Sequence, residues 1–184
     1  MKRWLIILLF IVSLFNISGC NSKNESNISF EVDRNGNYTG FSKLPAYRNA
    51  KKAVADGCYV KDGVEFKGTK YWNEFLHASM SGENAKLRMV ILSENKSNAS
   101  IDLFYQDGLY YVFKSDTDNL TANGYHHLLI LEDSKIVNHK IMYTVILSDD
   151  DIFTFTDIMK NLTSSKRVVM DEPYKIVYFG MKPV

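Results

Sequence analysis

The chain has 184 residues and is nearly neutral, with 22 Lys and Arg against 21 Asp and Glu. Without residues 1–19, which hold two basic and no acidic side chains, 20 basic residues face 21 acidic ones and the formal charge is −1. This balance argues against nucleic-acid binding, which needs clustered basic side chains, whereas a hydrophobic content of 46% is enough for one folded core.

Residues 1–20 have the layout of a secretory signal peptide that ends at a cysteine. Lys2 and Arg3 form a positive head, an apolar run broken by one serine extends over residues 4–15, and Ile17-Ser18-Gly19-Cys20 follows. The run is shorter than the roughly 20 apolar residues of a membrane-spanning helix and suits a signal-peptide core of about 7–15 residues. The ending resembles the lipobox of bacterial lipoproteins, in which an aliphatic residue and two small residues precede an invariant cysteine.

The lipobox resemblance implies that Cys20 carries lipid. In such lipoproteins the cysteine sulfur takes a diacylglyceryl group, and cleavage before the cysteine frees an amine that can also be acylated. Each buried methylene contributes about 0.8 kcal/mol, so two or more chains hold a protein stably on a bilayer. The expected location is the outer, extracytoplasmic face of the cell membrane, with the membrane as a partner through lipid on Cys20. The alternative is an ordinary signal peptide or membrane anchor in which Cys20 is incidental.

The expected domain organisation has three parts. Residues 1–19 are the signal peptide, residues 20–43 hold the lipidated Cys20 and a polar tether, and residues 44–184 form one globular domain. Four apolar residues of the tether offer a way for its end to dock on the domain, namely Phe30, Val32, Tyr38 and Phe41.

The first part of the domain predicts a helix, a hairpin and a second helix. Pro45 suits a helical first turn, and Gly57 suits the end of that helix. Residues 58–66 predict a hairpin with its tight turn at Asp62-Gly63. Apolar residues at helical spacing then predict a helix over residues 71–80.

From Ala85 the pattern changes to strands separated by turn residues. The expected strands cover residues 86–92, 99–105, 109–114, 125–131, 140–147 and 175–180. The acidic run Asp149–Asp151 is expected to cap a third helix that ends near Leu162. A calcium loop is the rival interpretation of this run, but the spaced Asp/Asn pattern, central Gly and closing Glu are missing.

This order of elements predicts an α+β fold, because the strands come in a block with helices at its ends. Short turns between strands favour antiparallel pairing. We therefore expect a single mainly antiparallel sheet of about five to seven strands, with about three helices packed on one face.

Candidate catalytic and metal-binding residues are few. The four histidines are His77, His126, His127 and His139. Adjacent histidines on a strand point to opposite faces, and His77 has no second ligand at the spacing of a helical zinc site. Cys58 has no partner cysteine and is expected to be a small buried hydrophobe. With no nucleophile elbow and no phosphate-binding loop, we expect no metal, no cofactor and no catalytic residue.

Aromatic residues crowd the hairpin formed by the strands over residues 99–105 and 109–114. They lie at adjacent positions, so they must occupy both faces of the sheet. A face that does not pack on the helices would expose them as a possible binding surface, with Tyr105, Tyr110, Tyr111 and Phe113 as its residues. The alternative is that aromatic side chains simply favour strands and stabilise cross-strand pairs.

Four segments carry a resemblance to a known group of proteins, namely Asn49–Gly57, Trp72–Leu76, Leu87–Val90 and Ile101–Tyr105. Together they resemble small lipoproteins of Gram-positive bacteria that carry an uncharacterised domain. The resemblance covers about residues 47–131, and the chain departs from it at Cys58 and in the strand, helix and strand that follow. It implies a lipoprotein with an α+β domain and carries over no activity and no catalytic residue.

These patterns favour one function over two alternatives. The expected protein is a membrane-anchored extracytoplasmic lipoprotein with a non-enzymatic binding domain for a protein, peptide or envelope component. One alternative is a secreted hydrolase whose site is assembled from scattered His, Asp and Glu residues. The other is a structural or stress-related envelope lipoprotein.

Overall fold

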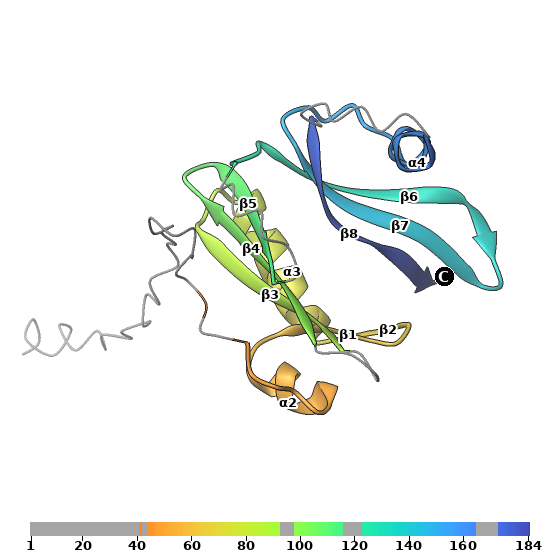
Figure 1. Ribbon diagram of the computed structural model, residues 1–184. Coiled ribbons are helices and arrows are strands. Elements are labelled where there is room, and N and C mark those ends of the chain that lie inside the picture. Colours follow the sequence, from red (N-terminus) through yellow and green to blue (C-terminus); the bar gives the residue numbers. More distant parts are fainter. Residues whose placement is uncertain (1–40, 42–43, 93–97, 116–122, 165–172) are drawn as a thin grey trace, which may run out of the picture.

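The computed structural model describes residues 41, 44–92, 98–115, 123–164 and 173–184. Within these ranges the chain is α+β, with two sheets of five and three strands (Figure 1). The predicted signal peptide and Cys20 lie outside the described residues. Within those ranges, no helix has both the length and the apolar character needed to span a membrane.

The five-stranded sheet and its helices come first along the chain. Their bounds are α2 (Ala50–Ala55), β1 (Tyr59–Asp62), β2 (Glu65–Lys67), α3 (Thr69–Met80), β3 (Ala85–Leu92), β4 (Ala99–Gln106) and β5 (Leu109–Lys114). The three-stranded sheet and its helix follow as β6 (His127–Val137), β7 (Lys140–Ser148), α4 (Phe155–Thr163) and β8 (Tyr174–Pro183).

The larger sheet has the order β2-β1-β3-β4-β5 and is mixed. The β1–β2 hairpin forms as predicted, with a positive φ of 61° at Gly63 in its turn. Helix α3 then carries the chain back, so that β3 pairs with β1 in the parallel direction. The pairing of the described strands is mainly antiparallel, as predicted, with β1–β3 as the parallel exception, but the expectation of a single sheet is wrong because the strands form two sheets.

The remaining strands form a second antiparallel sheet with the order β6-β7-β8. Near this change of sheet, Tyr125 makes a single antiparallel bridge to Tyr110 of β5. Strand β6 begins two residues later and extends to Val137, well beyond the predicted end near residue 131. The block of strands in the sequence is thus shared between two sheets.

Helices cover three different sheet faces, so the prediction of helices on one face is also wrong. Helix α2 buries Ala50 and Ala53 against one face of the larger sheet. Helix α3 and the smaller sheet share the other face, where Phe75 of α3 and Val145 of β7 join the main core. Helix α4 lies on the far face of the smaller sheet (Figure 1), where Ile158 is fully buried.

Two helix starts differ from those predicted. Helix α2 begins at Ala50 rather than near Pro45, because the side chain of Asn49 caps it by accepting a bond from the backbone of Lys52. Helix α4 begins at Phe155 with a capping box formed by Thr154 and Asp157. The acidic run Asp149–Asp151 therefore does not cap the helix.

A buried ion pair lies on the face of the larger sheet that α2 covers. Arg88 donates from Nε and Nη2 to the two carboxylate oxygens of Asp102, each at 2.6 Å, directly across the β3–β4 ladder. Burial raises the pKa of Asp102 and lowers the pKa of Arg88, because an apolar site disfavours either charge, and the two hydrogen bonds between them offset part of this cost. The ring of Phe41 lies 4.6 Å from the Arg88 guanidinium carbon and 5.5 Å from the Phe104 ring. Phe41 therefore packs on the domain as expected, whereas Phe30, Val32 and Tyr38 lie outside the described residues.

Candidate ligand-binding cavity

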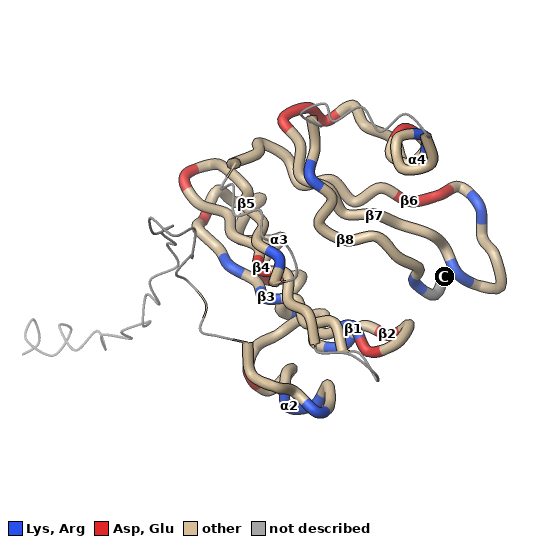
Figure 2. The backbone as a smooth tube through the Cα atoms, viewed as in Figure 1, with Lys and Arg blue, Asp and Glu red and all other residues tan. Residues whose placement is uncertain are grey.

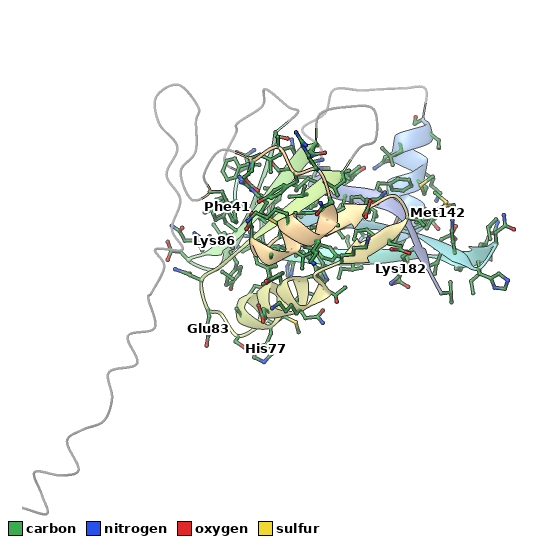
Figure 3. The ribbon with its side chains drawn as sticks, turned by 90° about the horizontal axis from the view of Figure 1, so that it is seen from below. Phe41, His77, Glu83, Lys86, Met142 and Lys182 are labelled. Atoms are coloured by element: carbon green, nitrogen blue, oxygen red, sulfur yellow. The ribbon has the colours of Figure 1, made fainter. Side chains whose placement is uncertain are left out.

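A cavity of about 130 Å³ lies where the two sheets and α3 meet. Its walls are mainly aromatic and aliphatic, with one charged side chain. The lining residues are Tyr59, Phe66, Trp72, Met89, Ile130, Tyr143, Val145 and Lys182. Figure 3 shows Lys182 well apart from Phe41, so the cavity is distinct from the buried ion pair on the other face of the larger sheet.

One wall of the cavity is a stack of three aromatic rings. The Tyr59 ring of β1 stacks between Phe66 of β2, at a centroid distance of 5.1 Å, and Trp72 of α3, at 5.5 Å. The smaller sheet meets this stack edge-on, with Tyr143 at 6.2 Å and Tyr178 at 5.7 Å from the Phe66 ring. These geometries are the favoured ones for aromatic pairs and give a rigid apolar wall.

Gly68 positions α3 so that Trp72 reaches this stack. It has a φ of 74° and lies immediately before the helix. A Cβ atom at this position would lie 2.6 Å from the backbone oxygen of Cys58. Glycine is therefore required both by the left-handed conformation and by the close approach of the two backbone segments.

The cavity carries opposite charges beside its smaller-sheet wall. Lys182 Nζ lies 2.5 Å from Oε1 of Glu132, and the two side chains are 37% and 42% exposed. The pair spans the middle strand of the sheet, and Lys182 Nζ also lies 5.5 Å from the centroid of the Tyr143 ring. Figure 2 shows the acidic segment of β6 and the basic C-terminal end of β8 that supply these charges.

Two tyrosines that line the cavity, Tyr59 and Tyr143, and a third, Tyr178, that packs against Tyr143, have phenol groups that stay neutral. Burial raises the pKa of Tyr59 and of Tyr178 to about 12, and it also raises the pKa of Tyr143, which Tyr178 and Tyr59 raise further. The Tyr178 hydroxyl is buried and has no hydrogen-bond partner among the described residues. It packs on Gly180, where a Cβ atom would lie 2.1 Å from it. At neutral pH these residues offer contact area and weak polarity, without a general base.

This tyrosine cluster predicts loss of stability in alkali. Between pH 10 and 12 the unfolded chain loses phenol protons that the folded chain keeps, so the free energy of unfolding falls as pH rises. We expect a loss of roughly 2 kcal/mol for each of these tyrosines over this range. Urea unfolding between pH 8 and 12, with phenolate absorbance as a second signal, checks it. Tyr59→Phe should reduce the loss, and an unchanged pH profile for this variant would contradict the assignment.

The four predicted binding-surface residues do not form one exposed surface. Tyr110 and Phe113 are buried, with 8% and 3% of their surfaces exposed, and this corrects their assignment to a binding surface. Tyr105 and Tyr111 are partly exposed but lie on opposite faces of the sheet. The physical reason is that both faces of the larger sheet are covered, one by α3 and the smaller sheet and the other by α2 and Phe41.

The geometry around His126 gives little support to the hydrolase alternative. His126 Nδ1 lies 2.8 Å from Oδ1 of Asp149, but both side chains are at least 60% exposed. The neighbouring Ser148 hydroxyl donates to the backbone oxygen of Pro173 and accepts from the backbone of Asp150. The part of the chain that the structure describes holds no group of three side chains suited to a metal ion. Cys58 is buried, as predicted.

Comparison with known proteins adds no relative. No family model matches the chain, and neither the curated proteins nor the solved structures gave a match. The cavity must therefore be judged on its own residues.

Sequence reasoning placed Trp72 only on an apolar helix stripe and did not connect it with Tyr143 or Lys182. A content of 13% aromatic residues was the one signal of such a site, and it does not locate it.

Proposed function

We propose that this protein is a lipid-anchored extracytoplasmic lipoprotein whose folded domain binds a small ligand in the aromatic cavity. The binding role depends on one observation, the cavity between the two sheets with its ring stack and adjacent charges. The anchoring role depends on the pattern of residues 1–20. No chemical step is assigned to the domain.

The size and lining of the cavity suit binding of a compact apolar group. A dry cavity of about 150 Å³ holds a benzene ring in a protein core, and the present cavity measures about 130 Å³. Aromatic walls lose little side-chain entropy on binding, because rings have few rotatable bonds. A few polar groups around an apolar pocket fix the orientation of a ligand, and Lys182 and Glu132 are placed for this.

The anchor is tested by replacing Cys20 with Ser. We expect Cys20→Ser to abolish incorporation of a palmitate analogue and to move the protein from the membrane pellet to the soluble fraction, because no acyl chain is attached. Cys58→Ser is the matched control and should keep both label and location, since Cys58 is buried in the domain. Mass spectrometry that finds Met1 intact, or Cys20 without lipid, would contradict the anchoring proposal.

The cavity is tested with an uncharged ring, benzyl alcohol, and the fluorescence of Trp72. Trp72 lines the cavity and is the one tryptophan in residues 20–184, so its emission reports on the site. We expect a saturable change that Ile130→Phe abolishes, because Ile130 lines the cavity and is 42% exposed, which leaves room for a ring to enter. Ile136→Phe, at a 59% exposed position of the same strand outside the lining, should leave binding unchanged. Equal binding by the wild type and Ile130→Phe would overturn the cavity as the site.

A further inference from the structure

We propose that the ligand is a small zwitterion with one apolar side chain, of the class of the hydrophobic α-amino acids. This inference rests on the proposed binding function and adds the chemistry of the ligand. It is drawn from the volume of the cavity, the position of its charges and the lack of charge deeper in its walls.

The volume limits the apolar part to one ring or one short branched chain. About 130 Å³ of space is close to the roughly 150 Å³ of a core cavity that binds one benzene molecule. A fused ring system or a fatty acyl chain needs more room than this. The aromatic stack formed by Phe66, Tyr59 and Trp72 offers a flat wall for that single group.

The charges indicate both an ammonium and a carboxylate on the ligand. Glu132 and Lys182 lie on the two outer strands of the smaller sheet and meet across Tyr143 on the middle strand. In an α-amino acid both charged groups are attached to the carbon that bears the side chain. When the side chain enters the cavity, the ammonium can therefore face Glu132 while the carboxylate faces Lys182. The protein ion pair opens, and each of its charges receives a new partner.

Ligands with one charge fit this arrangement less well. A lone cation stacked on the Tyr143 ring would meet the ammonium of Lys182, whose Nζ already lies 5.5 Å from the ring centroid. A lone anion at Lys182 would meet the carboxylate of Glu132, which lies 2.5 Å from the Lys182 ammonium. In both cases one protein charge also loses its partner, so opposite charges on one ligand are favoured.

The experiment compares five compounds that share a similar apolar group. The protein is residues 20–184 with Cys20→Ser, and binding is followed by Trp72 fluorescence and calorimetry at pH 7. The compounds are L-phenylalanine, L-leucine, 3-phenylpropionate, 2-phenylethylamine and benzyl alcohol. We expect at least one of the two amino acids to bind about tenfold or more tightly than the phenyl compounds with one charge or none, because each additional charge contact adds affinity.

Charge-neutralising variants identify the groups responsible. Glu132→Gln and Lys182→Met should each weaken amino-acid binding about three- to tenfold, as expected for partly exposed charge contacts, and should change benzyl alcohol binding by a smaller factor, because benzyl alcohol carries no charge. Lys67→Met is the matched control. It breaks the Lys67–Asp62 pair, whose side chains are 43% and 42% exposed and lie outside the cavity lining, and it should not change amino-acid affinity.

The outcomes separate this inference from the proposed function. If benzyl alcohol binds as tightly as both amino acids, the zwitterion is overturned while the cavity remains a binding site. If 3-phenylpropionate or 2-phenylethylamine binds more tightly than both amino acids, the zwitterion is likewise overturned. If none of the five compounds binds, both the zwitterion and the cavity as a small-molecule site are overturned.

Discussion

Replacing Arg88 with Met is expected to lower the free energy of unfolding by about 3–5 kcal/mol, the usual cost of leaving one member of a buried ion pair without the other. Arg88 and Asp102 are 8% and 0% exposed at their side chains and share two hydrogen bonds of 2.6 Å. Burial raises the pKa of Asp102, so a carboxyl without Arg88 must either take up a proton or remain charged in an apolar site. Urea unfolding followed by circular dichroism measures the loss.

A double variant separates the cost of a broken pair from the value of the pair. Arg88→Met combined with Asp102→Leu should cost less than Arg88→Met alone, because a buried pair replaced by apolar residues leaves no isolated charge. Lys52→Met breaks the exposed pair with Asp56, where Lys52 is 68% exposed, and should cost less than about 1 kcal/mol. If Arg88→Met costs no more than Lys52→Met, the ion pair is open to water and its burial is wrong.

Local sequence patterns were enough to predict most individual elements. The strands β3, β4 and β5 lie within about one residue of their predicted ends, because alternation and turn residues are properties of neighbouring positions. The buried Cys58 and the docking of Phe41 also followed from residue type and hydrophobicity. The N-caps at Asn49 and Thr154 were missed because stronger-looking signals, Pro45 and the acidic run, lay a few residues before them.

Longer-range features could not be predicted, because each depends on how segments far apart in the sequence pair or pack. Arg88 and Asp102 are oppositely charged residues in two predicted strands, and only the register of the β3–β4 ladder places them directly opposite each other. The cavity requires residues from both sheets and α3, and the division of the strands into two sheets has no local signature. Tyr110 and Phe113 were assigned to a surface for the same reason, since the sequence does not say what covers each face of a sheet.

Gly68→Ala is expected to lower the free energy of unfolding by about 2–4 kcal/mol, the second large effect. An alanine in the left-handed region costs about 1–2 kcal/mol. Its Cβ would also lie 2.6 Å from the backbone oxygen of Cys58, so the start of α3 must move away from β1. Because Trp72 lies in the first turn of this helix and stacks on Tyr59, the movement should also change the emission spectrum of Trp72.

Gly63→Ala is the control that isolates the close approach. Gly63 has a similar positive φ of 61°, but a Cβ atom there would meet nothing within 4 Å. This variant should therefore lower the free energy of unfolding by about 1–2 kcal/mol, because alanine is strained in the left-handed conformation, and it should leave Trp72 emission unchanged. The difference between the two variants measures the contact between Gly68 and Cys58. Equal losses with identical spectra would mean that α3 does not depend on this contact, and that Trp72 is held against the cavity by the packing of its own ring.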